Sequence, residues 1–113
     1  MLDVQTRHLP DDVVVLEVTG RVTLGRDCKE LEWTTEKLVQ ENKNKIIFDL
    51  SGVTHIDSTG IGIIVMCSGH IKKAGGQLRV VCSPGHVDQV LKTTSVDKVV
   101  QIHSTVAGAA ASL

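Results

Sequence analysis

Short runs of apolar, mostly β-branched residues recur along the chain, and the segments between them have helical character. This alternation constrains the fold more than any other feature, because short runs of this kind are typical of strands. Strands are predicted at residues 13–18, 45–50, 77–81 and 99–102, with a weaker candidate at 4–7. Strands that alternate with helices form a mostly parallel sheet, because crossover connections return the chain to the same end of the sheet.

Four helices are predicted, at residues 26–41, from near 60 to 74, at 84–93 and at 105–112. In the first of them Leu31, Thr35 and Leu38 recur at helical spacing. The second is stopped by Gly75 and Gly76, because glycine is the residue that most often ends a helix.

The connections complete the expected architecture. Residues 9–12 read Leu-Pro-Asp-Asp and predict a turn, so the first two strands form an antiparallel hairpin. Residues 51–56 are expected to be a connection in which Val53 and Ile56 are buried. The predicted fold class is therefore α/β, with a mixed, mostly parallel sheet of 4–5 strands and about four helices, and residues 1–113 form a single domain.

Length and composition exclude several classes of protein. The 113 residues suffice for one packed core and not for two. Lys and Arg number 12 against 13 Asp and Glu, and the net charge of -1 argues against nucleic acid as the main partner. The longest apolar stretch, residues 61–67, is much shorter than the roughly 20 residues of a membrane span. We therefore expect a soluble, cytoplasmic protein with no nucleic-acid and no membrane partner.

Neither the cysteines nor the histidines follow a metal or disulfide pattern. Cys28, Cys67 and Cys82 are an odd number without Cys-x-x-Cys spacing, so reduced, buried thiols are expected. The five histidines form no His-x-x-x-His pair. The sequence therefore predicts no metal and no cofactor.

The segment Asp-Ser-Thr-Gly from Asp57 to Gly60 lies between a buried strand and a helix, where α/β folds place their sites. A hydroxyl there meets free backbone N–H groups and the positive end of the helix dipole, so Ser58 is a position where a phosphate can be accepted. The alternative, which four residues alone favour, is that Asp57 or Ser58 simply caps the helix. His55 and Asp57 do not make a catalytic triad with Ser58, because no Gly-x-Ser-x-Gly elbow is present.

The start of the second helix is apolar on nearly every side. One face carries Ile61, Ile64, Val65 and Ser68, and another carries Ile63, Met66 and Cys67. One sheet cannot bury both faces, so either a neighbouring helix covers the second face or it is an exposed contact patch. Gly60 and Gly62 match no phosphate-binding loop and are expected either to allow close packing or to suit a backbone that needs small residues at the helix start.

The stretch from Asp49 to Gly62 reads Asp-Leu-Ser-Gly-Val-Thr-His-Ile-Asp-Ser-Thr-Gly-Ile-Gly. It resembles the signature of the STAS domain, specifically of the bacterial anti-sigma factor antagonists. Gly20, the Gly75–Gly76 pair and the segment after Ser83 also follow the family's pattern, so the resemblance covers nearly the whole chain. It implies the STAS fold.

The resemblance further implies a binding module that is controlled by phosphorylation and is not an enzyme. Family members bind an anti-sigma factor that is also a serine kinase, which frees the sigma factor. The kinase inactivates the antagonist by phosphorylating the serine directly after the Asp, which is Ser58 here, and a serine phosphatase can reset the switch. The partner-binding residues that the resemblance implies are Asp57, Ser58, Thr59, Gly60, Ile61 and Thr23.

Two positions depart from the family pattern. Many antagonists carry an acidic residue where this chain has Thr23, near the phosphorylation loop, which leaves the efficiency of phosphorylation or the identity of the partner open. Ser95 replaces a usual glycine in an expected turn.

The alternative function is a STAS scaffold or accessory subunit of a sensory complex or lipid-transport system. A nucleotide hydrolase is a weaker alternative, because no Walker motif is present, and the oligomeric state is open.

Overall fold

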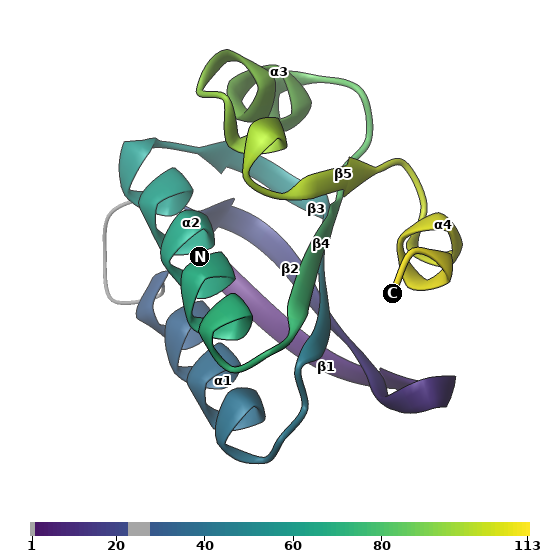
Figure 1. Ribbon diagram of the computed structural model, residues 1–113. Coiled ribbons are helices and arrows are strands. Elements are labelled where there is room, and N and C mark those ends of the chain that lie inside the picture. Colours follow the sequence, from purple (N-terminus) through teal and green to yellow (C-terminus); the bar gives the residue numbers. More distant parts are fainter. Residues whose placement is uncertain (1, 23–27) are drawn as a thin grey trace.

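The computed structural model describes residues 2–22 and 28–113, and five strands in this part of the chain form one sheet in the order β1-β2-β3-β4-β5 (Figure 1). The strands are β1 Leu2–Leu9, β2 Val13–Val22, β3 Lys45–Ile56, β4 Gln77–Val81 and β5 Gln101–His103. β1 pairs antiparallel with β2, and each later pair is parallel. The predicted mixed, mostly parallel sheet with an antiparallel hairpin at its edge is confirmed.

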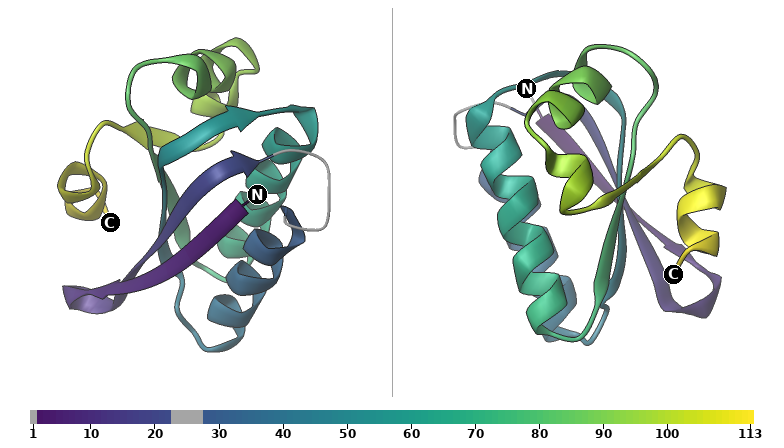
Figure 2. Two further views of the ribbon diagram at one scale, coloured as in Figure 1. Left: turned by 180° about the vertical axis from the view of Figure 1, so that it is seen from behind. Right: turned by 45° about the horizontal axis from the view of Figure 1, so that its top comes forward.

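Helices cover the sheet unequally on its two faces. The α-helices are α1 Cys28–Gln40, α2 Ser58–Lys73, α3 His86–Thr93 and α4 Val106–Ala111, and two short 3₁₀ helices span Pro10–Asp12 and Val96–Lys98. α1 and α2 lie side by side on one face, α4 lies on the other, and α3 sits beyond the carboxyl ends of the parallel strands (Figure 2). This arrangement leaves the outer part of the α4 face, over β1 and β2, without a helix (Figure 2, left).

The core explains why the run at residues 13–18 is apolar without alternation. Val14, Leu16 and Val18 belong to the main cluster beneath α1 and α2. Val13 and Val15 belong to a smaller cluster that includes Ala109 of α4. A strand sends successive side chains to opposite faces, so a strand buried on both faces is apolar throughout.

The predicted connection at residues 51–56 is wrong, because β3 continues to Ile56. The neighbouring strand β2 runs on to Val22 and supplies backbone partners for this segment, with register shifts that absorb its irregular pattern. Val53 and Ile56 are 7% and 6% exposed, so their predicted burial is confirmed. The extension carries the chain directly to the start of α2.

Helix α2 begins at Ser58, slightly earlier than expected, and ends as predicted before Gly75, whose φ is +83°. Its buried residues are Gly60, Ile63, Ile64, Cys67, Ser68 and Ile71. Val65 and Met66 are each 39% exposed, so one residue of each predicted apolar face lies at the surface. The buried residues come from both faces because α2 packs against α1 as well as against the sheet.

The third predicted helix and the last predicted strand begin later than expected. α3 starts at His86, because Gly85 adopts φ +149°, a conformation that ordinary residues avoid. The last strand is β5 rather than residues 99–102, because Ser95 enters the left-handed region at φ +63° and a 3₁₀ turn follows it. The turn leaves Val99 42% exposed and buries Val100.

Candidate functional site

Ser58 lies where the sequence placed it, at the carboxyl end of a central parallel strand. β3 ends at Ile56, Asp57 makes the turn, and Ser58 is the first residue of α2. Its side chain is exposed, whereas Asp57 and Thr59 beside it are half-buried. A modifying enzyme can therefore reach the Ser58 hydroxyl without any unfolding of the core.

The side chain that caps α2 is that of Asp57. Its backbone is extended, at φ -118° and ψ -174°, and its Oδ1 accepts a hydrogen bond from the backbone N–H of Gly60 at 2.9 Å. A carboxylate at this place also meets the positive end of the helix dipole. Of the two predicted caps, Asp57 therefore takes the role, and the Ser58 hydroxyl is left at the surface.

Gly60 holds the start of α2 against the end of β2. A Cβ on Gly60 would overlap the Val22 carbonyl oxygen, well inside van der Waals contact distance, and would lie 2.9 Å from the Ile56 side chain. The same carbonyl accepts a hydrogen bond from the backbone N–H of Asp57 at 3.3 Å. The expected close packing is confirmed at Gly60, but a Cβ on Gly62 would meet nothing within 4 Å, so that explanation is wrong there.

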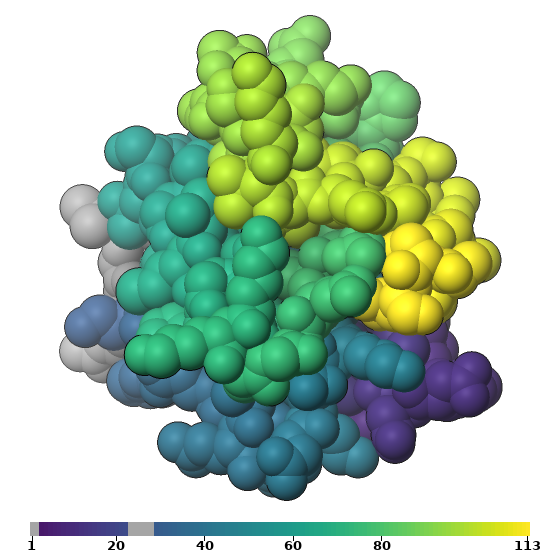
Figure 3. Space-filling view, viewed as in Figure 1, coloured from purple at the N-terminus to yellow at the C-terminus, as the bar shows by residue number. Residues whose placement is uncertain are grey.

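An exposed stripe runs down α2 from Ser58. The exposed residues at helical spacing behind it are Gly62, Val65, Met66 and Gly69, which we call the α2 stripe. Two of them are glycines and two are apolar. The stripe is therefore low, in the sense that no side chain covers the helix backbone at the glycines, and it carries no charge. Figure 3 shows α2, drawn in teal and green, at the surface of the molecular face in view. Ser58 stands at its amino-terminal end.

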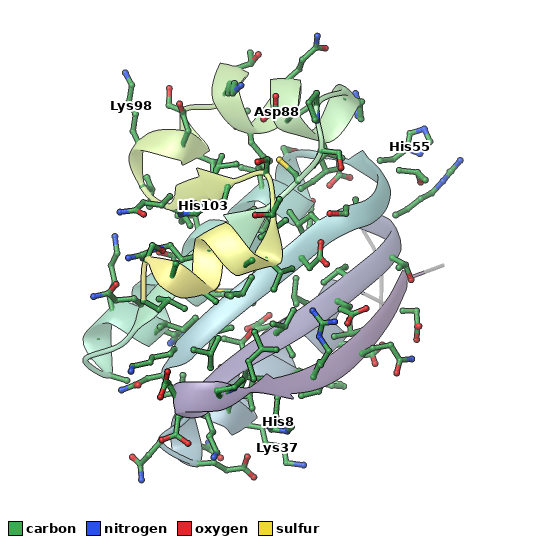
Figure 4. The ribbon with its side chains drawn as sticks, turned by 90° about the vertical axis from the view of Figure 1, so that its right-hand side faces the viewer. His8, Lys37, His55, Asp88, Lys98 and His103 are labelled. Atoms are coloured by element: carbon green, nitrogen blue, oxygen red, sulfur yellow. The ribbon has the colours of Figure 1, made fainter. Side chains whose placement is uncertain are left out.

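Two histidines from different elements meet beside the carboxyl end of β3. The rings of His55 and His86 are 5.9 Å apart and tilted by 56°, and Figure 4 shows His55 at the molecular edge. The Nδ1 atom of His55 lies 3.1 Å from Thr54 Oγ1. His55 is therefore engaged with Thr54 and His86, and Asp57 caps α2, so the arrangement does not supply a base–nucleophile relay to Ser58.

A cavity of about 620 Å³ lies elsewhere, between α3 and β5. Its lining includes Cys82, Asp88, Lys92 and His103. Asp88 forms an ion pair with Lys92 at 3.1 Å. Among the residues that the structure describes, no group of three or more His, Cys, Asp or Glu side chains could hold a metal ion.

Cys67 and Cys82 are free and buried, as predicted. Burial raises the pKa of each thiol from 9.0 to about 11. For Cys82 the negative charge of Asp88 and a hydrogen bond to it raise the pKa further. Both residues are therefore uncharged thiols at neutral pH.

Thr23, the remaining predicted partner-binding residue, lies outside the described residues. Ile61 is half-buried and packs against the main core cluster. The sequence offered an exposed contact patch on this helix as an alternative, with Met66 among its residues, but it predicted neither the α2 stripe as a whole nor the His55–His86 contact. Gly62 and Gly69, spaced seven residues apart around exposed apolar residues, are the signal that could have indicated the stripe.

Comparison with known proteins decides the family. A family model of the STAS domain matches residues 4–109. The chain belongs to the STAS domain family. A Thermotoga maritima protein assigned as an anti-sigma factor antagonist is 31% identical to this STAS protein over 99 residues, which are 88% of each chain.

Solved structures agree with this placement. A crystal structure of an assigned anti-sigma factor antagonist from Thermotoga maritima superimposes with a TM-score of 0.85 at 30% identity, covering 96% of this chain and 92% of that one. An anti-sigma factor antagonist from Mycobacterium paratuberculosis gives 0.86 at 21% identity, with coverage of 99% and 93%. SpoIIAA in its unphosphorylated form gives 0.73 at 12% identity, with coverage of 97% and 96%, and its phosphorylated form has also been solved. At such low identity the last two comparisons show the fold alone.

None of the helices in the described part of this STAS protein combines the length and apolar character that a membrane span requires.

Proposed function

We propose that this protein is an anti-sigma factor antagonist, that it binds an anti-sigma factor serine kinase through the surface around Ser58, and that phosphorylation of Ser58 ends this binding. The observation that carries the proposal is the position of Ser58, which is exposed in the first turn of α2 at the head of the α2 stripe. The 31% identity to an assigned antagonist supports the same function.

The proposed contact surface begins at Asp57, Ser58, Thr59 and Ile61 and continues along the α2 stripe. A low, uncharged stripe lets a partner approach the helix backbone closely, and exposed apolar side chains are the usual centre of a protein interface. Gly60 is buried, so we propose that it seats α2 against β2 rather than touching the partner.

The proposed switch is electrostatic. A phosphate on Ser58 adds about -1.5 to -2 charges at neutral pH. It would lie directly beside Asp57, whose carboxylate already occupies the backbone N–H of Gly60. The capped helix N-terminus therefore stabilises the phosphate charge less than an uncapped one would. The charge of the phosphate then opposes binding, because a partner must remove water from this surface.

This switch needs no refolding. The contacts that hold the start of α2 come from the Asp57 carboxylate, the Gly60 backbone and the Val22 carbonyl, and none of them uses the Ser58 side chain. Phosphorylation should therefore change binding and leave the free energy of unfolding nearly unchanged.

The test compares four immobilised proteins in a pull-down from lysate of the source organism: wild type, Ser58→Asp, Ser58→Asn and Ser104→Asp. Ser104 is also exposed but follows β5 at a distance from α2, so its variant adds the same charge elsewhere. We expect wild type, Ser58→Asn and Ser104→Asp to capture a histidine-kinase-like ATPase, identified by mass spectrometry, and Ser58→Asp to lose it.

The captured ATPase is then purified and titrated against the same variants by calorimetry. The proposal expects Ser58→Asp to weaken binding by about tenfold or more, since a charge buried without a partner costs more than 1.4 kcal/mol. Equal affinity of wild type and Ser58→Asp would overturn the switch. Capture of transporter or sensor-complex subunits by all four proteins would favour the scaffold function instead.

A further inference from the structure

One edge of the sheet is a long strand, β1, whose outer side faces no other strand among the residues that the structure describes. β1 spans Leu2–Leu9 and pairs with β2 along its whole length, with no bulge in the register. It is the first strand in the sheet order, so within the described residues no strand pairs with its other side (Figure 2, left). The opposite edge strand, β5, has only three residues. A long, regular edge presents a row of N–H and C=O groups that can pair with another chain.

The side chains of β1 are complementary to themselves. Asp3, Gln5 and Arg7 alternate along one face of the strand and are all exposed. If two copies of β1 pair antiparallel with Gln5 opposite Gln5, Asp3 of each copy lies opposite Arg7 of the other. Directly opposed residues of unlike charge stabilise a strand pair, and this register contains two such pairs.

The other face of β1 has room for an added strand. Val4 packs towards the main core beneath α1. Further along, a cavity of about 390 Å³ separates β1 from α1, and its lining is Thr6, His8, Thr34, Lys37, Leu38 and Glu41. Figure 4 shows His8 of β1 and Lys37 of α1 beside each other in this region. In the register described, Val4 of the second copy lies opposite Thr6, next to this cavity.

We propose that two copies of this chain associate through antiparallel pairing of β1 with β1, with Gln5 on the two-fold axis. The partner is a second copy because the charges of β1 are complementary to those of another β1 that runs in the opposite direction. The two-fold axis is perpendicular to the sheet, so α1 and α2 of both copies lie on the same face of one continuous sheet. The two Ser58 residues then lie at opposite ends of the dimer and both stay exposed, so the proposal does not depend on the proposed function.

Cross-linking tests the register. Gln5→Cys is made in a Cys28→Ser background, where Cys67 and Cys82 are buried. Residues opposite each other in an antiparallel pair have Cα atoms about 4.5–5.5 Å apart, within the range of a disulfide. We expect Gln5→Cys to form a disulfide dimer under mild oxidation, and a mixture of Asp3→Cys and Arg7→Cys proteins to form a mixed one.

Asp3→Cys alone is the matched control, since its two copies would lie about 13 Å apart along the strands and should not cross-link. Cross-linking of Asp3→Cys as readily as Gln5→Cys would overturn the register. A Gln5→Cys protein that stays reduced would overturn the strand pairing.

Charge reversal tests the same pairing without cysteines, by sedimentation equilibrium at concentrations up to about 1 mM. Wild type should approach twice the 12.2 kDa mass of one chain. Asp3→Arg should raise the dissociation constant of the dimer about tenfold or more, because it makes both opposed pairs repulsive. The triple variant Asp3→Arg, Arg7→Asp, Glu17→Arg should restore it, since it also keeps an inverted form of the Arg7–Glu17 ion pair, whose atoms are 3.3 Å apart.

Asp97→Arg, which makes the same charge change at an exposed residue away from β1, should leave the dissociation constant unchanged. A wild-type protein that stays monomeric throughout the concentration range would overturn the proposal. A dimer that Asp3→Arg does not weaken would also overturn it, and would place the contact on another surface.

Discussion

Two strand-to-helix junctions at the same end of the sheet are built in opposite ways. At the β3–α2 junction a single residue, Asp57, separates strand from helix and caps the helix with its side chain. At the β4–α3 junction four residues intervene, from Cys82 to Gly85, and Gly85 at the cap position offers no side chain. The first junction is tight and presents Ser58 on a fixed helix end. The second borders the cavity of about 620 Å³ and has no side-chain cap at the start of its helix.

The difference follows from neighbouring strands. β2 extends past the centre of the sheet to Val22, so its last carbonyl lies against Gly60 and receives the N–H of Asp57. β5 ends at His103 and borders the open cleft against α3. A long neighbour therefore closes one junction, and a short neighbour leaves the other open. The first junction therefore holds Ser58 in a fixed position, whereas the second leaves a cavity.

The largest expected effect comes from filling the contact at Gly60. Gly60→Ala should lower the free energy of unfolding by about 2–3 kcal/mol, because the added Cβ overlaps the Val22 carbonyl and neither backbone can move freely. Gly85→Ala at the second junction has open space for a Cβ but an unfavourable φ, so it should cost about 1–2 kcal/mol. Urea denaturation followed by circular dichroism measures both.

Gly62→Ala is the control for this pair. It has no steric conflict inside the same helix, so it should stabilise the protein by about 0.5–1 kcal/mol. Gly60→Ala and Gly62→Ala variants of equal stability would show that the close approach of α2 to β2 is not what holds the first junction.

A smaller effect is expected from removing the cap. Asp57→Ala should cost about 1 kcal/mol, because the N–H of Gly60 loses its acceptor at the helix start. Asp57→Asn keeps an acceptor oxygen and should retain most of the stability. Thermal unfolding at neutral pH measures both, and an Asp57→Ala protein as stable as wild type would mean that the cap does not hold this junction.

The smallest expected effect concerns the Cys82 thiol at the second junction. Cys82 ionises near pH 11 in the folded protein and near 9 in the unfolded chain. The unfolded state therefore loses this proton first, and stability should fall as pH rises from about 9 towards 11. The rate of iodoacetamide labelling at Cys82, measured by mass spectrometry against pH, should have its midpoint near 11.

Asp88→Asn should move the labelling midpoint of Cys82 downwards, because the Asp88 charge and hydrogen bond both raise the pKa of this thiol. Cys67, whose pKa is raised by burial first of all, is the internal control and should not shift. Equal shifts at both thiols would indicate a general loosening of the fold rather than a local effect at the second junction.

Much of this protein is determined by local sequence. Runs of β-branched residues specify strands, and spacing such as Leu31, Thr35 and Leu38 specifies a helix, because both depend on the side-chain period of a single element. The stretch from Asp49 to Gly62 indicated the family, and the Asp-Ser-Thr-Gly segment within it indicated the strand-to-helix position of Ser58, because both are patterns of consecutive residues.

Only the tertiary structure decided what depends on distant neighbours. β3 continues to Ile56 because β2 supplies its backbone partners, and the last strand begins late because Ser95 turns the chain first. Val65 and Met66 are exposed because α1 and the sheet together choose which side of α2 is buried. Periodicity predicts that a helix has an apolar side, but two packing surfaces together decide which residues of α2 are buried. The local sequence does not determine this, because it depends on how α1, α2 and the sheet pack against one another.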